Sequence, residues 1–155
     1  MNPLLKLIIG GIATKLAVDS LKKQNKTPQR RIFISHSWKK GSKDYNSLIN
    51  KLSVSNIPFY NHSIPLDRAF NENNKKELEK IFRKQMVHCS KIFVLATRGV
   101  KSNTFVMTEI KIAKSLKKEI IAVKPHGQKG IPDFIRRNSS KIISNNINSI
   151  KEALK

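Results

Sequence analysis

The residue in this sequence that is best placed to do chemistry is a single glutamate, Glu109. It lies about two turns into a predicted helix that begins at Ser102 or Asn103 and continues with basic residues. A lone carboxylate can stabilise positive charge that develops on a sugar carbon, or it can hold a ribose hydroxyl. Ordinary glycoside cleavage needs a second carboxyl group to protonate the leaving oxygen. One carboxylate would therefore suffice only where the leaving group is already cationic and departs as a neutral molecule.

A simpler interpretation of Glu109 is a carboxylate that offsets neighbouring lysines, such as Lys111 and Lys114, on a helix surface. Spacing alone favours this simpler interpretation. Other chemistries find no support, because the sequence lacks the glycine-rich phosphate loops and the serine nucleophile elbow. The four histidines lie in separate segments without metal-ligand spacing, so we expect no metal site. The single cysteine, Cys89, precedes an apolar run and is predicted to be a buried, inert thiol, as in a reducing cytosol.

The chain has 155 residues, enough for one domain with a sizeable core and a short appendage. Its 31 basic and 10 acidic residues give a net charge of +21. Six basic residues and one acidic residue lie in the first thirty positions, which leaves +16 for the remainder. Such a charge attracts polyanions, or it merely solvates the helix surfaces. We do not expect nucleic acid as a partner, because the sequence shows no aromatic-studded basic groove and no recognition helix.

Residues 1–29 differ from the rest of the chain. Apolar side chains recur at four-residue spacing, which predicts a helix with one apolar face, and a polar linker follows: Leu4, Ile8, Ile12 and Leu16. Lysines bound the uninterrupted apolar run, which is far shorter than the ~20 residues of a membrane span. We expect either an interface with another subunit or protein, or a helix at a membrane surface. The protein is predicted to be cytoplasmic, with peripheral membrane attachment through this helix as a further hypothesis.

From residue 30 onward, short apolar strands alternate with helical patterns. The strands are predicted at 32–34, 57–60, 92–96, 120–123 and 142–143, with helices between and after them. This alternation indicates an α/β domain over 30–155, with helices on both faces of a five-stranded parallel sheet. Right-handed crossovers favour the flavodoxin-like order 2-1-3-4-5. A crevice is then expected between the loops 35–43 and 97–102, with 61–65 as its third wall.

Four separated segments of this domain resemble the Thoeris-type branch of the Toll/interleukin-1 receptor (TIR)-like domains. They are FISHSW at 33–38, FYNHSIP at 59–65, the long segment from CSKIFVL to KEIIAV at 89–123, and KPHGQKGIPDFI at 124–135. The resemblance covers about residues 30–155 and implies the flavodoxin-like TIR fold. In enzymatic members it also implies cleavage of NAD, whose nicotinamide is a cationic leaving group, and cyclisation to a cyclic ADP-ribose-type messenger. Such messengers switch on a separate effector protein during bacterial defence against phages.

By position, the resemblance implies that Glu109 is the catalytic residue. It also implies a nucleotide pocket lined by residues of two loops, with one tyrosine packed behind it: Ser35, His36, Ser37, Trp38, Asn61 and Ser63, with Tyr45 behind. His36 could equally orient its loop, Trp38 could cap the core, and the serines could be turn residues. NAD is expected as substrate, with no separate cofactor, and self-association through TIR surfaces is expected. The alternative function is a catalytically silent TIR-like adaptor or nucleotide sensor.

Overall fold

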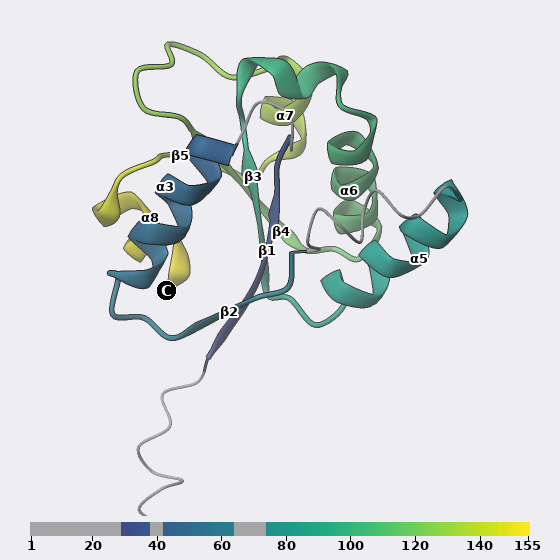
Figure 1. The fold of residues 1–155 in the computed structure, drawn as a ribbon, viewed down its shortest axis with the longest axis horizontal. Coiled ribbons are helices and arrows are strands. Elements are labelled where there is room, and N and C mark those ends of the chain that lie inside the picture. The colour runs from purple at the N-terminus through teal and green to yellow at the C-terminus, as the bar shows by residue number, and fades with distance from the viewer. Residues whose placement is uncertain (1–28, 38–41, 64–73) are drawn as a thin grey trace, which may run out of the picture.

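The computed structural model describes residues 29–37, 42–63 and 74–155 (Figure 1). Five parallel strands form one sheet in the order β2-β1-β3-β4-β5. The strands are β1 (Arg30–Ser35), β2 (Phe59–Asn61), β3 (Lys91–Leu95), β4 (Glu119–Lys124) and β5 (Lys141–Ser144). The predicted flavodoxin-like order is therefore confirmed.

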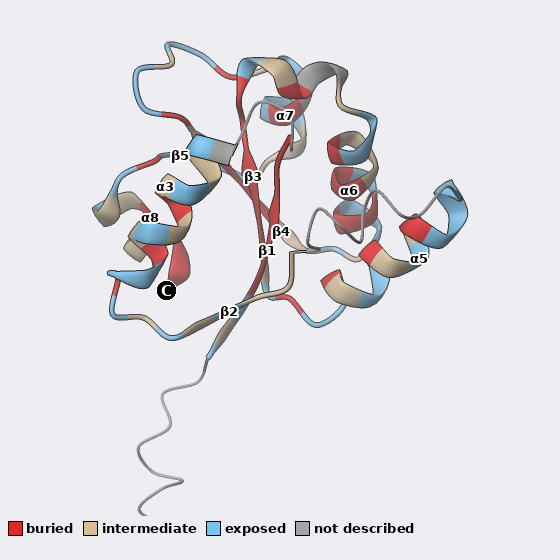
Figure 2. Cartoon of the chain, viewed as in Figure 1, coloured by how far each residue is buried: buried red, intermediate tan, exposed pale blue. Residues whose placement is uncertain are grey.

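Helices cover both faces of this sheet (Figure 1). On one face lie α5 (Lys75–Met86), α6 (Thr104–Ser115) and α7 (Asp133–Asn138), and on the other lie α3 (Ser42–Ser53) and α8 (Ile147–Leu154). The buried residues of the sheet lie in its central strands β1, β3 and β4, as Figure 2 shows. Because both faces are covered, β3 carries four consecutive apolar residues, Ile92 to Leu95, that are all fully buried.

Successive strand residues point to opposite faces, and this alternation divides the core into two clusters. Ile92 and Val94 of β3 pack with α5 and α6, whereas Phe93 and Leu95 pack with α3 and α8. A single strand thus holds the two helical layers in register. The position of the helix that carries Glu109 depends directly on this central strand.

Two predicted segments differ in detail from the structure. The second strand was predicted at 57–60 but lies at Phe59–Asn61, because the preceding turn passes through Asn56 in the left-handed region (φ 60°). The segment 97–102, predicted as a polar turn, contains a 3-10 helix at Arg98–Ser102. Val100 lies on that 3-10 helix and is 1% exposed, so this turn of helix buries an apolar side chain in the core.

The predicted N-terminal helix and linker at 1–29 lies outside the described residues, except for Gln29. In the part of the chain that the structure describes, no helix is both long enough and apolar enough to cross a membrane.

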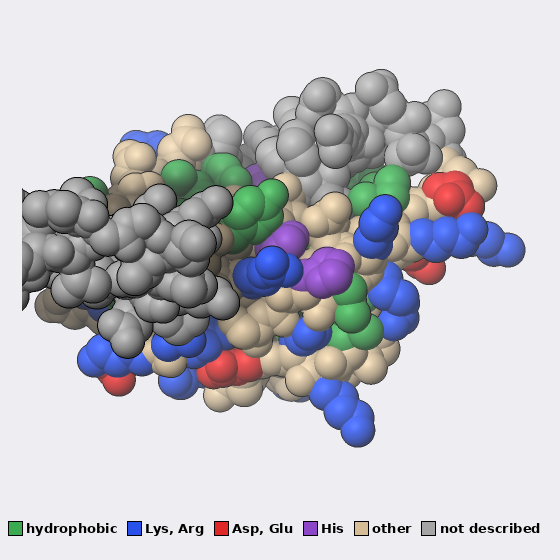
Figure 3. Space-filling model, turned by 90° about the horizontal axis from the view of Figure 1, so that it is seen from below, with side chains coloured by type: hydrophobic (Ala, Val, Ile, Leu, Met, Phe, Trp, Pro, Cys, Tyr) green, Lys and Arg blue, Asp and Glu red, His purple; other side chains and the backbone are tan. Residues whose placement is uncertain are grey.

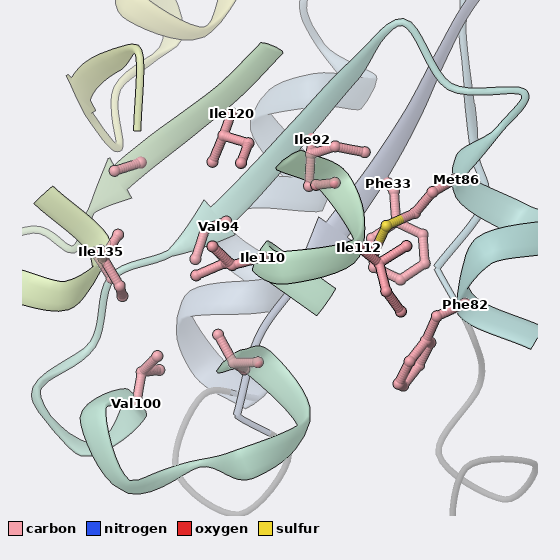
Figure 4. Close-up of a cluster of buried hydrophobic side chains, with 14 of the residues drawn as sticks. Phe33, Phe82, Met86, Ile92, Val94, Val100, Ile110, Ile112, Ile120 and Ile135 are labelled. Carbon is pink, nitrogen blue, oxygen red and sulfur yellow. The ribbon is translucent and has the colours of Figure 1, made fainter. Parts of the chain in front are cut away.

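The core beneath α5 offers a direct test of the packing (Figure 4). Phe82 is 2% exposed, and its ring meets that of Phe33 edge to face, with 6.3 Å between centroids. We expect Phe82→Ala to lower the free energy of unfolding by about 3–5 kcal/mol, because it leaves a cavity in the core. Phe105→Ala is the matched control, since Phe105 is 41% exposed and its loss should cost far less. Urea denaturation of both variants measures this, and equal losses would contradict the packing.

Candidate active site

Glu109 is buried at the carboxyl edge of the sheet. Its side chain, which is 6% exposed, accepts a hydrogen bond at Oε2 from Ser35 Oγ. Ser35 is the last residue of β1 and pairs with Val94 of β3. The bond therefore joins two residues 74 positions apart in sequence, at the point where two neighbouring strands end. This is the edge at which ligands bind in open parallel sheets.

Helical spacing explains why this carboxyl group is buried. Val106, Ile110 and Ala113 of α6 all pack into the core, and Glu109 shares their side of the helix because residues three and four apart are neighbours. Asn103 starts this helix, since its Oδ1 accepts hydrogen bonds from the backbone amides of Phe105 and Val106. The interpretation of Glu109 as a solvated surface carboxylate is therefore wrong.

The electrostatic state of Glu109 follows from its surroundings. Burial raises the pKa of the Glu109 carboxyl from 4.5 to about 8, because desolvation penalises the charged form, and the hydrogen bond from Ser35 opposes this rise. None of the four ion pairs among the described residues involves Glu109. At neutral pH the group is accordingly mostly protonated. It would ionise more readily beside a cation.

The loop that follows β1 is held from two directions. The His36 ring stacks on the Tyr45 ring, with 4.1 Å between centroids, and burial lowers the pKa of His36 to about 4, so the imidazole is neutral. Ser37 Oγ accepts a hydrogen bond of 3.1 Å from Asn103 Nδ2. Asn103 therefore caps α6 and ties it to this loop. Sequence reasoning identified Asn103 only as a helix start and missed this second contact.

Asn61 and Ser63, which were predicted to face the pocket from the second loop, form hydrogen bonds with Tyr45 and with β1. Ser63 Oγ accepts a hydrogen bond of 2.8 Å from the Ile34 amide, which extends the ladder beyond the end of β2. Asn61 Nδ2 donates to the Tyr45 hydroxyl at 3.0 Å, and Asn61 Oδ1 accepts from the Ser63 amide at 2.9 Å. The polar atoms of Asn61 and Ser63 thus hold the wall behind His36. Trp38 lies outside the described residues.

Two polar groups at this edge of the sheet were not identified from the sequence. Thr97 follows β3, is 7% exposed, and has a buried hydroxyl without a hydrogen-bond partner. Asn145 follows β5, and its buried Oδ1 also lacks a partner, beside a cavity of about 370 Å³. The signal available in the sequence was position, since Asn145 comes directly after β5 and Thr97 lies two residues after β3.

Two further predictions concern metals and the cysteine. Within 29–37, 42–63 and 74–155, no group of three or more His, Cys, Asp or Glu side chains could hold a metal ion. Cys89 is 2% exposed, as predicted, and burial raises the pKa of its thiol to about 12.

The model of the family described as Thoeris protein ThsB, TIR-like domain, matches residues 33–130, which is more than half of the chain. The chain belongs to this family. Membership in a Thoeris family implies a defence-system context. The matched region contains the second half of β1, all of β2 to β4 and the whole of α6, and so includes both Ser35 and Glu109.

A comparison with curated proteins found no match. Among solved structures, the CMP N-glycosidase BcmB of Clostridium botulinum is 18% identical, with a TM-score of 0.49 over 81% of this chain and 97% of that chain. A phosphoheptose isomerase from Francisella tularensis is 16% identical, with a TM-score of 0.46 over 98% of this chain and 78% of that chain.

The burial of Glu109 predicts how stability depends on pH. A carboxyl whose pKa is raised on folding stabilises the fold at low pH, and this contribution is lost as pH rises from 4.5 through about 8. Glu109→Gln removes the ionisation, so above about pH 9 the variant should be more stable than wild type, by on the order of a few kcal/mol. Thermal unfolding across pH measures this difference.

The control for this experiment is Glu77→Gln, because Glu77 is exposed at the start of α5. If the Glu109→Gln and Glu77→Gln variants follow the same pH dependence, the carboxyl of Glu109 is not desolvated in the folded protein.

Proposed function

We propose that this domain cleaves NAD at the bond between nicotinamide and ribose, with Glu109 as the catalytic residue. The observation that carries the proposal is the buried Glu109 carboxyl, held by Ser35 at the carboxyl edge of the sheet. The N-glycosidic bond would break with its electron pair leaving on the nicotinamide nitrogen. The carboxylate of Glu109 would stabilise the positive charge left on the ribose.

The raised pKa of Glu109 fits a cationic substrate. In the free protein, burial keeps the carboxyl mostly protonated near neutral pH. A nicotinamide ring bound beside Glu109 would supply a positive charge. An opposite charge at short range favours the carboxylate form. Substrate binding would thus ionise the catalytic group in a site from which water is largely excluded. No acid is required, because nicotinamide departs as a neutral molecule.

The first loop would position the dinucleotide. Ser35 orients the carboxyl of Glu109, and Ser37 is fixed through Asn103, so both hydroxyls have defined directions. His36 and Tyr45, with Asn61 and Ser63 behind them, would form the rigid wall on which the substrate rests. Trp38 is included in this proposed pocket only because of the resemblance to TIR-like domains.

The product would act as a signal. After nicotinamide leaves, attack by water on the ribose carbon gives linear ADP-ribose, whereas attack by a nucleophile of the same molecule gives a cyclic isomer. Because the family belongs to the Thoeris defence context, we propose that this product reaches a separate effector protein by diffusion. Self-association through TIR surfaces belongs to the same proposal.

The direct test is release of nicotinamide from NAD by the full chain, with products identified by mass spectrometry, in the presence and absence of a phage lysate as activator. Wild type should form ADP-ribose or a cyclic isomer, and Glu109→Gln should lose at least about a hundredfold in rate. Glu77→Gln is the matched control and should retain activity. Equal turnover by wild type and Glu109→Gln would remove Glu109 from the mechanism, and stoichiometric binding of NAD without turnover would favour an adaptor or sensor.

The pH profile gives a second test that separates ionisation from folding. Because the carboxylate is the working form, kcat/KM should increase as pH rises through about 8, the pKa of free Glu109. Ser35→Ala removes the hydrogen bond that favours the carboxylate, so the profile should move to higher pH. A Ser35→Ala profile that keeps the wild-type midpoint would contradict this role of Ser35.

A further inference from the structure

The end of the sheet opposite Glu109 carries basic side chains beside exposed hydrophobic ones. Because all five strands are parallel, every turn that leads into a strand lies at this amino end, and the helices that return to it bring their last turns there. Figure 3 views the molecule from this end and shows Lys, Arg and His side chains beside hydrophobic ones. We call it the basal surface, and it comprises Arg31, Val54, Tyr60, Val87, His88, Lys117 and Lys118.

Charge is distributed unevenly between the two ends. Three of the acidic residues in the described helices lie in first turns, at the far end: Asp44, Glu77 and Asp133. At the amino end, Glu119 lies 3.5 Å from Lys91, and Glu152 lies 2.8 Å from Lys155. Both of these carboxylates are thus neutralised by a lysine. None of the four ion pairs among the described residues involves a basic side chain of the basal surface.

Arg31 and Lys117 occupy different local positions. Arg31 lies on β1, where no helix end accounts for its charge. Lys117 follows the C-cap of α6, and its amide donates to the Lys114 carbonyl, so its charge also offsets the dipole of that helix. It adopts a left-handed conformation, with φ 53°, in which glycine or asparagine would be less strained.

Exposed apolar side chains accompany this charge. Val54, Tyr60 and Val87 are 64%, 52% and 49% exposed, and they are three of the five large hydrophobic residues that the described chain exposes. Each lies at the amino end, before or at the start of a strand or after a helix. The Tyr60 ring meets His62 at 4.6 Å between centroids, and His62 stacks over His88 at 6.1 Å. An aromatic ring with a polar tip beside basic groups is typical of a protein surface at a membrane interface.

The chain enters the domain at the same end. β1 begins at Arg30, and residues 1–28 precede it, with apolar residues at four-residue spacing and lysines between them. An amphipathic segment and a basic surface are each weak membrane signals, and stable attachment takes two signals acting together.

We propose that the basal surface docks on an anionic lipid bilayer, which would leave the carboxyl edge with Glu109 facing away from the membrane. The partner is a lipid surface with negatively charged headgroups. Nucleic acid offers the same negative charge, but it would not account for exposed Val54 and Val87 beside the basic residues. This proposal does not depend on the enzymatic function, because none of the basal residues contacts Glu109 or Ser35.

The test is cosedimentation of the full chain with vesicles of phosphatidylcholine and phosphatidylserine in equal parts, and with vesicles of phosphatidylcholine alone. We expect binding to the mixed vesicles only. Each basic side chain near an anionic surface contributes about fivefold to partitioning, so Arg31→Glu with Lys117→Glu should weaken binding by at least about twentyfold. Val87→Ser should weaken it by a smaller factor, since it removes an apolar contact without changing the charge.

The matched control is Lys124→Glu with Lys129→Glu, which makes the same change of net charge at the opposite end of β4. If this control weakens vesicle binding as much as the basal variant does, net charge alone drives binding and the proposal is wrong. It is also overturned if wild type does not bind the mixed vesicles. Retention of a DNA duplex that depends on Arg31 and Lys117, while vesicle binding does not, would identify the surface as a nucleic-acid site instead.

Discussion

The hydrogen bond between Ser35 and Glu109 is the contact on which the candidate site depends. This bond connects the end of β1 to α6, the helix that follows β3. Ser35 is the residue that donates a hydrogen bond to the buried carboxyl group. A buried carboxyl without a cation is more stable in its protonated form, because burial penalises the charge. In the proposed function, a ligand that brings positive charge would favour the carboxylate form of Glu109.

The packing of the surrounding structure holds Glu109 beside Ser35. β3 contributes side chains to both core clusters, so the helix carrying Glu109 and the sheet carrying Ser35 cannot move independently. Asn103 adds a polar connection, because it caps α6 and binds Ser37 in the first loop. The stacking of His36 on Tyr45 fixes the loop on its other side. A catalytic group held in this way requires little reorganisation when charge develops on a substrate.

The parallel arrangement of the strands also separates two tasks in space. The carboxyl end of the sheet carries the buried Glu109 carboxyl of α6 and the polar groups around it, whereas the amino end carries exposed basic and apolar side chains. A parallel sheet creates such a division automatically, because its two edges are built from different sets of loops. Changes at one edge can then leave the other undisturbed.

The sequence by itself determined the order of the strands, the layers of helices and the family. Apolar runs of strand length and the four separated motifs are local patterns, so they can be recognised without the tertiary structure. It also indicated Glu109, although spacing alone favoured a surface role. Only the tertiary structure decided that Glu109 is buried against Ser35, since that contact joins positions 74 apart and depends on how α6 packs. The protonation of Glu109, the double role of Asn103 and the engagement of Asn61 and Ser63 within the protein were decided in the same way. Desolvation and long-range hydrogen bonds are properties of the folded chain and leave no local pattern in the sequence.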